Sequence, residues 1–227
     1  MKIIAKSQPL HTQVYEYIKE KIISGEIPCG EKVQEVKLST EINISRSPVR
    51  EALRTLENDG LIVQSENGLI VNPMTYDDTV EVYECRILFE SFAARLAATN
   101  ISNIQLEELA ACVHRMHELH DKDYEGSYLN IISNNTRFHQ IIAEASNHRL
   151  ITGYINKNNA LSMLARANEF NLFHRDSSYI TEHISIYNAI NNHNPSQAEK
   201  AVKDHISNDL RFYKEKYSIQ MKKSSNI

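Results

Sequence analysis

The sequence predicts a mainly α-helical protein, with an N-terminal winged helix-turn-helix and a C-terminal all-α antiparallel helical bundle. Residues 45–54 combine a helix start with outward-facing arginines, a pattern typical of a helix that enters the DNA major groove. Two β-rich runs, 61–64 and 69–71, follow around an Asn-Gly pair, the strongest short signal for a hairpin. From residue 75 onward the patterning is helical, without β alternation.

The second helix of the motif is expected to use Ser47 as its N-cap, with Pro48 at the first helical position, where a missing N–H is harmless. Its apolar face comprises Val49, Ala52, Leu53 and Leu56. Cations recur every four residues on another face, at Arg46, Arg50 and Arg54. Asn43 is expected to adopt the left-handed conformation that the preceding turn needs. The alternative is an ordinary helical hairpin with a solvated arginine face.

The charge balance limits the kind of DNA binding that is expected. The chain has a formal net charge of −4, and residues 1–75 contain nine Lys/Arg and ten Asp/Glu. Non-specific binding needs a large basic surface, so affinity should rest on a few placed arginines and on two copies at a palindromic site. An arginine paired bidentately with guanine supplies roughly 1–3 kcal/mol of discrimination. Phosphate contact or plain solvation is expected of Lys32, Lys37 and Arg54.

Composition and cysteine usage indicate a cytoplasmic protein. The 227 residues contain no apolar run long enough for a membrane helix. The N-terminal segment 1–9 lacks the long apolar core of a signal peptide. The three cysteines are odd in number and scattered, which favours free thiols in a reducing compartment.

The domain boundary is predicted at residues 72–74, because Pro73 is disfavoured in a central strand. A DNA-binding domain is therefore expected over 1–73 and a helical domain over 74–227. Six helices are expected in the second domain, at 75–98, 103–121, 127–145, 148–170, 176–192 and 195–217. Capping pairs mark three starts: Thr75 with Asp78, Ser102 with Gln105, and Asn194 with Gln197. The breakers are Gly126, Gly153 and Pro195. A compact bundle would bury the apolar stripes.

Two histidines are predicted to lie at one level of neighbouring antiparallel helices. His183 lies nine residues before an expected helix end, and His205 lies ten residues after the next expected start. At about 1.5 Å per residue both are roughly 14–15 Å from the shared turn. His139 adds a third imidazole, and Asn135 lies one turn earlier on the same face as His139.

Three imidazoles and one oxygen donor can bind zinc, nickel, manganese or iron, with open positions left for a ligand. The alternative is coincidence, because ten histidines in 227 residues place some pairs at matching heights. A further trio is expected on a solvated helix surface: His114, His117 and His120.

The segment 13–71 resembles the DNA-binding domain of the GntR family of bacterial transcription regulators. The matching motifs are Ile23-Ser24-Gly25-Glu26-Ile27, Gly30-Glu31-Lys32-Val33, Ser45-Arg46-Ser47-Pro48-Val49-Arg50-Glu51-Ala52-Leu53, Leu56, Gly60-Leu61 and Gly68. The resemblance implies base or phosphate contacts by Ser45, Arg46, Ser47 and Arg50, and a minor-groove contact by the wing glycine, Gly68. Cys29 and Asn43 replace the usual Pro and Gly of the family, and neither departure touches the DNA face.

Residues 76–215 resemble the FCD effector domain of FadR-type GntR regulators, which is an all-α bundle. The motifs are Arg86-x-x-x-Glu90, Asn135-Thr136-Arg137-Phe138-His139, Glu182-His183-Ile184 and His205-Ile206. In many FCD domains an Asp and three His at these positions bind a divalent metal. The three histidines match, but Asn135 replaces the Asp and contributes no negative charge, so weaker binding of a divalent ion, zinc foremost, is expected. Alternatively the site is vacant and the histidines bond the effector directly.

The resemblance also implies an acidic effector. Arg86 matches an arginine that faces the pocket in the family, and its guanidinium fork fits two carboxylate oxygens. The alternative is that Arg86 reaches out to solvent along its aliphatic stem. Further candidates for effector contacts are Arg137, Arg166, Tyr179 and Asn208.

These features predict a ligand-responsive, DNA-binding transcription regulator rather than an enzyme. It is expected to bind a palindromic operator as a homodimer and to act as a repressor modulated by a small organic or sugar acid. One alternative is a metal sensor without an organic effector. Another is a helical metalloenzyme with a nucleic-acid module, but the sequence has no His-Glu-x-x-His, Glu-x-x-His or Gly-x-Ser-x-Gly motif.

Overall fold

The computed structural model describes residues 8–122, 128–172 and 177–224. The chain divides into two compact units, Met1–Met74 and Thr75–Ile227. Gly126 and the expected helix starts at 127 and 176 lie outside the described residues. Within the described residues, no helix is long and apolar enough to cross a membrane.

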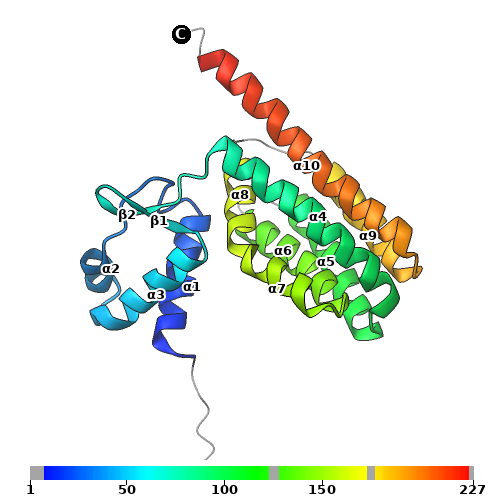
Figure 1. Ribbon diagram of the computed structural model, residues 1–227, viewed down its shortest axis with the longest axis horizontal. Helices are drawn as coiled ribbons and strands as arrows, with labels where there is room; N and C mark the ends of the chain where they lie inside the picture. The colour runs from blue at the N-terminus through cyan, green and yellow to red at the C-terminus, as the bar shows by residue number, and fades with distance from the viewer. Residues whose placement is uncertain (1–7, 123–127, 173–176, 225–227) are drawn as a thin grey trace, which may run out of the picture. The chain divides into compact units, whose positions relative to one another are not determined.

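The first unit is a winged helix-turn-helix (Figure 1). Its elements are α1 (Leu10–Ile23), α2 (Glu35–Glu41), α3 (Arg46–Asn58), β1 (Ile62–Ser65) and β2 (Gly68–Val71). The strands pair antiparallel, and Lys32 adds an isolated bridge to Ile70. Apolar side chains of the three helices and the hairpin form one core, which includes Ile18, Val49, Leu56, Leu61 and Val71.

The second helix of the helix-turn-helix, α3, starts two residues earlier than expected. α3 begins at Arg46, and Ser45 rather than Ser47 occupies the N-cap position with extended backbone angles (φ −60°, ψ 156°). Pro48 still falls within the first turn, where the amide N–H has no intrahelical partner to lose. The left-handed conformation predicted for Asn43 is confirmed, with φ at 51°.

The predicted hairpin is present, but its connection is two residues long, because Ser65 and Gly68, expected between the strands, belong to them. Glu66 and Asn67 form the turn, and Gly68 begins β2 opposite Ser65 with φ at 106°. The Ser65 hydroxyl donates to the Gly68 carbonyl over 2.7 Å, which ties the two strand ends together. The glycine therefore supplies the positive φ after the turn and not within it.

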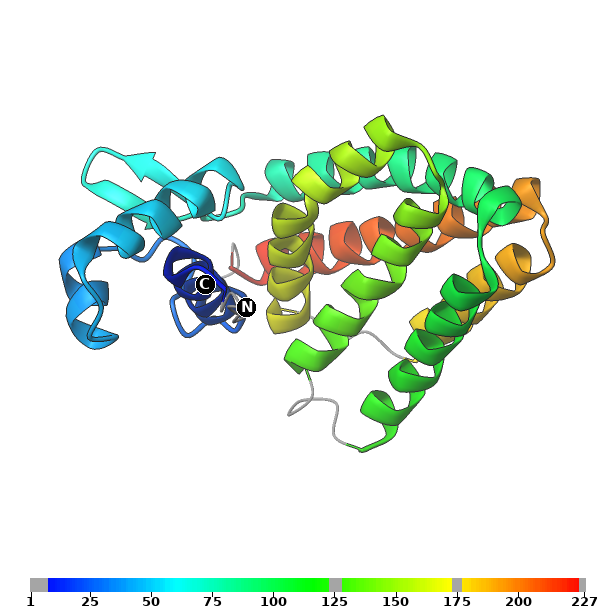
Figure 2. The same cartoon turned by 90° about the horizontal axis from the view of Figure 1, so that it is seen from below.

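The second unit is an all-α bundle (Figures 1 and 2). Its helices are α4 (Tyr76–Asn100), α5 (Asn103–Lys122), α6 (Tyr128–Ala145), α7 (Arg149–Lys157), α8 (Asn159–Leu172), α9 (Ser178–Asn191) and α10 (Pro195–Ser224). α4 and α10 pack along each other, and α5 and α6 run antiparallel (Figure 2). The largest fully buried side chains of the unit include Tyr83, Phe138, Leu164 and Ile186.

The capping pairs are confirmed as local start signals. Thr75 and Asp78 form a complete capping box at α4. Ser102 and Gln105 exchange two backbone-to-side-chain hydrogen bonds of 3.1 and 3.3 Å at α5. At α10, the backbone N–H of Gln197 donates to Asn194 Oδ1 over 3.1 Å. Each pair satisfies backbone donors that the first turn leaves open.

The expectation of one helix over 148–170 is wrong. The segment is two helices, α7 and α8, which are separated at Asn158. The Asn158 amide donates to the Tyr154 carbonyl over 2.8 Å, and the Ser162 N–H bonds the Asn158 carbonyl. A local bond from an Asn side chain competes with helix continuation, and the pattern of apolar residues alone does not reveal that competition.

Candidate nucleic-acid interface and histidine cluster

α3 presents the residues that were predicted to contact DNA on an exposed face. Its apolar residues Val49, Ala52, Leu53 and Leu56 are buried within the unit. The exposed residues are Ser45, Arg46, Ser47, Arg50 and Arg54, and Lys37 is exposed on α2. The hydroxyl and guanidinium groups are therefore accessible to a bound duplex.

One carboxylate on α2 joins two of these arginines. Arg46 Nε donates to Glu35 Oε1 over 2.6 Å. Arg50 donates to both oxygens of the same carboxylate, from Nε to Oε2 over 2.8 Å and from Nη2 to Oε1 over 2.9 Å. Hydrogen bonds from Arg50 and then Arg46 lower the pKa of Glu35 to about 2, so the carboxylate is ionised near neutral pH.

The wing places a cation beside its glycine. Gly68 lies where β2 begins, and a Cβ built on it would lie 3.7 Å from Cε of Lys32. Lys32 is therefore next to the glycine that was predicted to enter the minor groove. Positive side chains are favoured in that groove because its potential is strongly negative.

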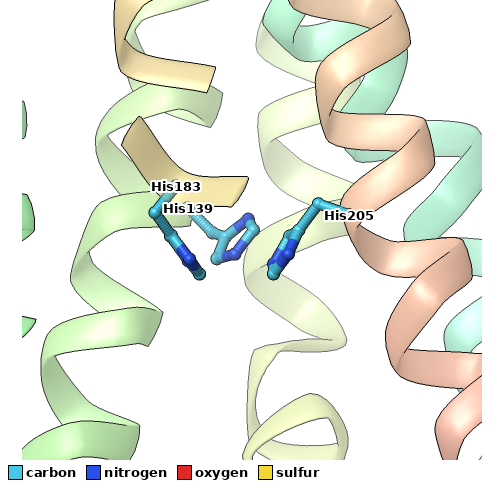
Figure 3. A group of neighbouring side chains, drawn as sticks. All are labelled: His139, His183 and His205. Atoms are coloured by element: carbon cyan, nitrogen blue, oxygen red, sulfur yellow. The ribbon is translucent and has the colours of Figure 1, made fainter. Parts of the chain in front are cut away.

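The bundle brings together the three histidines that the sequence placed at one level. His139 comes from α6, His183 from α9 and His205 from α10 (Figure 3). All three side chains are buried, and one nitrogen of each lies within 4.8 Å of the others. The His183 and His205 ring centroids are 4.4 Å apart. The helix-rise argument for His183 and His205 is therefore confirmed.

Each histidine has its Nδ1 atom directed at an oxygen that can only accept a hydrogen bond. His139 Nδ1 lies 2.7 Å from Glu90 Oε2, His183 Nδ1 lies 2.7 Å from the Tyr179 carbonyl, and His205 Nδ1 lies 2.7 Å from Glu182 Oε2. The proton of each neutral ring must then be on Nδ1. The three Nε2 atoms keep their lone pairs, which is the tautomer that a metal requires.

Asn135 supplies an oxygen to the same place. Its Oδ1 atom lies 2.8 Å from His183 Nε2. Among the described residues, His139 Nε2 is buried without a hydrogen-bond partner. Acceptor atoms that converge in a buried place are typical of a cation site. The donor set of three imidazoles and an amide oxygen therefore fits a divalent metal.

Arg86 and Glu90 form a buried pair behind His139. Arg86 Nε donates to Glu90 Oε1 over 2.8 Å, one helical turn along α4. Burial raises the pKa of Glu90, but the guanidinium and the His139 N–H outweigh it and hold that pKa well below its usual range. Burial also lowers the pKa of His139, helped by Arg86 and Arg166 and opposed by Glu90. His139 is therefore a neutral imidazole beside an ionised carboxylate.

Glu182 contacts Nδ1 of His205 as Glu90 contacts Nδ1 of His139. Its second oxygen, Oε1, accepts from Asn208 Nδ2 over 2.8 Å. Asp209, also buried, places Oδ2 3.7 Å from His205 Nε2. Asn208, predicted as an effector contact, is therefore found orienting a carboxylate that in turn orients a histidine.

The remaining effector candidates fall into two groups. Arg137 lies away from the triad, because its guanidinium pairs with Glu108 and Glu144. Its predicted effector role therefore has no support in this structure. Arg166 is buried on α8, where its Nε donates to the Ser162 carbonyl, and Tyr179 is buried on α9. These two residues remain candidates.

The second histidine trio is only partly as expected. His114 and His117 are exposed on α5, but His120 is half-buried and its ring contacts Tyr179 edge-on at 6.0 Å. Among the described residues, none of these three histidines belongs to the cluster of His139, His183 and His205.

Sequence reasoning assigned no role to several carboxylates that contact the candidate site residues, Glu90 beside His139 among them. Glu35 is remote in sequence from the arginines that it joins, so no helical spacing indicates the contact. Glu182 directly precedes His183 but serves His205 on the next helix. Asp209 follows His205 by one turn, so helical spacing is a sequence signal for that contact.

The fold combines a winged helix-turn-helix with an all-α bundle that buries a histidine cluster. Residues 10–69 match the bacterial regulatory proteins of the gntR family, and residues 81–208 match the FCD domain. The chain therefore belongs to the FCD-domain regulators of the GntR family.

Relatives cover nearly the whole chain. The HTH-type transcriptional regulator YdhC of Bacillus subtilis (strain 168) is 29% identical over 211 residues, which are 92% of this chain and 93% of that protein. The HTH-type transcriptional repressor RspR of Escherichia coli (strain K12) is 24% identical over 201 residues, 88% and 87% of the two chains. The solved structure of E. coli McbR/YncC has a TM-score of 0.79 at 18% identity, covering 93% and 100%. The chain is thus a transcription regulator and not an enzyme, and the solved structure supports its fold.

Proposed function

We propose that this regulator is a cytoplasmic repressor that binds a palindromic operator as a homodimer and responds to a small carboxylate held in a metal-containing pocket. The observation that carries the proposal is the buried triad of His139, His183 and His205, whose Nδ1 atoms are all directed at acceptors. Three carefully oriented imidazoles are more than a packed core requires, since a core is filled at lower desolvation cost by apolar side chains. The name of RspR, a repressor, supports the assigned direction of control.

The donor set favours zinc over harder cations. Neutral imidazole nitrogen suits zinc, nickel, copper or iron, whereas magnesium and calcium prefer oxygen. Carboxylates on two of the three Nδ1 atoms raise the basicity of the imidazoles and fix their orientation. When bound, the ion would leave coordination positions open for an acidic effector. Nickel, manganese and iron remain the other candidates.

Asn135 suits a site that is filled reversibly. An amide can present Oδ1 to a metal, or turn so that Nδ2 donates to the lone pair on His183 Nε2. An aspartate carboxylate in the same place could only accept a hydrogen bond, and His183 Nε2 carries no proton to donate in the tautomer described here. Asn135 therefore allows the pocket to be satisfied with and without the ion, at the expense of affinity.

The charges around the triad favour an anionic effector once the metal is present. Among the described residues, two guanidiniums (Arg86 and Arg166) face three carboxylates (Glu90, Glu182 and Asp209), a formal balance of −1. A divalent ion turns this balance to +1. A buried positive site attracts a carboxylate strongly because the surrounding dielectric is low. Metal and acid should therefore bind cooperatively.

The small number of exposed arginines on α3 supports the proposed homodimer. One α3 offers only three arginines, and the unit has no excess of basic residues to hold DNA by general attraction. Two copies on a two-fold operator double the contacts and read two half-sites. The proposed dimer would have one arrangement that binds the operator and another that does not. The effector can alter operator affinity only if it binds these two arrangements with different affinities.

A thermal-shift screen tests the pocket. Full-length protein would be heated with small mono- and dicarboxylates and sugar acids, each with zinc and with a chelator. We expect an acid that stabilises the zinc form and loses its effect with chelator or in His183→Ala. His114→Ala is the matched control, because His114 is 77% exposed and remote from the triad. Equal stabilisation with and without zinc, or no stabilisation by any acid in the panel, would remove the metal-anchored carboxylate site.

A metal sensor without an organic effector is the second candidate. The full set of Nδ1 partners favours it, since the site is organised for an ion before any acid arrives. It predicts that zinc alone changes operator affinity, whereas the proposed function predicts that zinc acts only together with an acid.

A further inference from the structure

The Glu35 carboxylate is shared by Arg46 and Arg50, two residues of the α3 face that was predicted to contact DNA. Glu35 is the first residue of α2, and its side chain is only 19% exposed, whereas Arg46 and Arg50 are 60% and 53% exposed. The two arginines lie one turn apart on α3 and converge on that one carboxylate. Glu35 is thus the most buried of the three side chains, and its carboxylate holds the two longer, more exposed arginine side chains.

The arginines use the same edge of the guanidinium for this contact. Arg46 donates through Nε, and Arg50 donates through Nε and Nη2. A guanidinium carries five N–H donors in a fixed planar fork. Engaging the Nε edge leaves the outer edge, formed by the Nη1 and Nη2 hydrogens, able to bind the O6 and N7 atoms of a guanine. Glu35 and a base can therefore be held by one arginine at the same time.

We propose that Glu35 is a positioning residue for sequence reading: it holds Arg46 and Arg50 with their outer edges toward the base edges and so sets the discrimination between operator and other DNA. The inference rests on the proposed function only in taking α3 as the reading helix. It concerns specificity and not affinity alone.

Two physical effects of the carboxylate point the same way. Fixing two flexible side chains before binding lowers the ordering cost that specific contacts must overcome. The negative charge also weakens attraction to phosphates, which is the main source of non-specific binding. Glu35 should therefore strengthen specific binding while weakening non-specific binding, and its removal should reverse both trends.

The test compares two duplexes. One is recovered by selection from a randomised library with the full-length wild-type protein, and the other has the same composition in scrambled order. We expect Glu35→Gln to lower the ratio of the two affinities about tenfold or more, since each bidentate arginine–guanine pair contributes discrimination of that order. Affinity for the scrambled duplex should rise, because the negative charge that opposes phosphate contacts is removed.

Glu41→Gln is the matched control. It removes the same charge from the same helix, but Glu41 pairs with Lys21 over 2.9 Å and not with the arginines. Its affinity ratio should equal that of the wild type. If Glu35→Gln also leaves the ratio unchanged, or changes it only as much as Glu41→Gln does, the inference is overturned.

A double-mutant cycle separates positioning from a structural effect of the substitution. In an Arg46→Lys/Arg50→Lys background the charges remain, but a lysine ammonium has no second edge of N–H donors with which to bind a base. Glu35→Gln should then have no further effect on the ratio, measured at low salt where both duplexes bind. The same tenfold loss in that background would show that Glu35 acts elsewhere. A selection that recovers no preferred duplex would instead overturn the proposed function itself.

Discussion

His183 Nε2 and Asn135 Oδ1 lie 2.8 Å apart, and both are acceptors when His183 Nδ1–H donates to the Tyr179 carbonyl. Two lone pairs cannot remain that close in a buried site without a proton or a cation between them. The pair is stabilised by a bound ion, or by turning the amide so that Nδ2 donates. In the proposed metal site, Asn135 would therefore influence how tightly an ion is held.

Asn135→Asp should tighten zinc binding by roughly tenfold, because a carboxylate compensates the charge of the ion better than an amide. The same change should destabilise the zinc-free protein, in which the new carboxylate faces a lone pair. Competition with a zinc-binding dye measures the affinity, and thermal unfolding measures the stability of the zinc-free form. Asn188→Asp, an equal charge change on the exposed side of α9, should do neither. Unchanged zinc affinity in Asn135→Asp would exclude this residue from the ion.

Glu182→Gln should weaken zinc binding by about 10- to 100-fold, because the carboxylate no longer orients His205 or raises its basicity. The amide keeps the size of the side chain, so the fold should persist. Dye competition again gives the affinity. Glu144→Gln is the control, since Glu144 pairs with Arg137 away from the triad. Equal zinc affinities in the two variants would contradict a role for Glu182 in metal binding.

The ion pairs of Glu35 should make a contribution to stability that acid removes. Hydrogen bonds from Arg50 and Arg46 lower the pKa of Glu35 from 4.5 to about 2. Because the folded pKa is depressed, the contribution is complete above about pH 4.5 and is lost as pH falls toward about 2. The difference in unfolding free energy between wild type and Glu35→Gln should be constant above that window and shrink within it. It should also shrink in high salt, since the pair is partly exposed. A difference that does not depend on pH would refute the pairing.

Gly68→Ala should destabilise the winged-helix unit by about 1–3 kcal/mol, because φ at 106° is strained for a residue with a Cβ. Steric overlap is not the cause, as the nearest heavy atom would be Lys32 Cε at 3.7 Å. Gly153→Ala is the counterpart within α7, where nothing lies within 4 Å of the added Cβ. It should stabilise the second unit by about 0.5–1 kcal/mol. Urea denaturation followed separately for the two units measures both changes, and equal effects would contradict the turn geometry.

Features set by nearby residues were predictable from the sequence. Asn43 adopts the left-handed conformation because its own side chain tolerates it, and Thr75 and Asp78 form their box across three residues. The levels of His183 and His205 follow from helical rise on either side of one turn. In each case the responsible residues are close in sequence or linked by a regular element.

Features set by tertiary contact were not predictable from one sequence. Glu35 reaches arginines on another helix, and Arg137 pairs outward although its neighbour His139 faces inward.

Asn158 breaks a helix that the apolar pattern continues, because a side-chain hydrogen bond competes with the backbone. Ser45 rather than Ser47 lies at the N-cap position of α3, and its hydroxyl makes no capping hydrogen bond, so the preference of serine for this position does not distinguish the two.

Under the proposed function, an acid held at the metal site of the bundle controls operator binding. The most direct measurement is the operator Kd with a stabilising carboxylate from the panel, for zinc-loaded protein, for chelated protein and for His183→Ala. We expect the acid to weaken operator binding by about 5- to 150-fold in the zinc-loaded protein only. The same weakening in the chelated protein or in His183→Ala, or none in any of the three, would contradict this expectation.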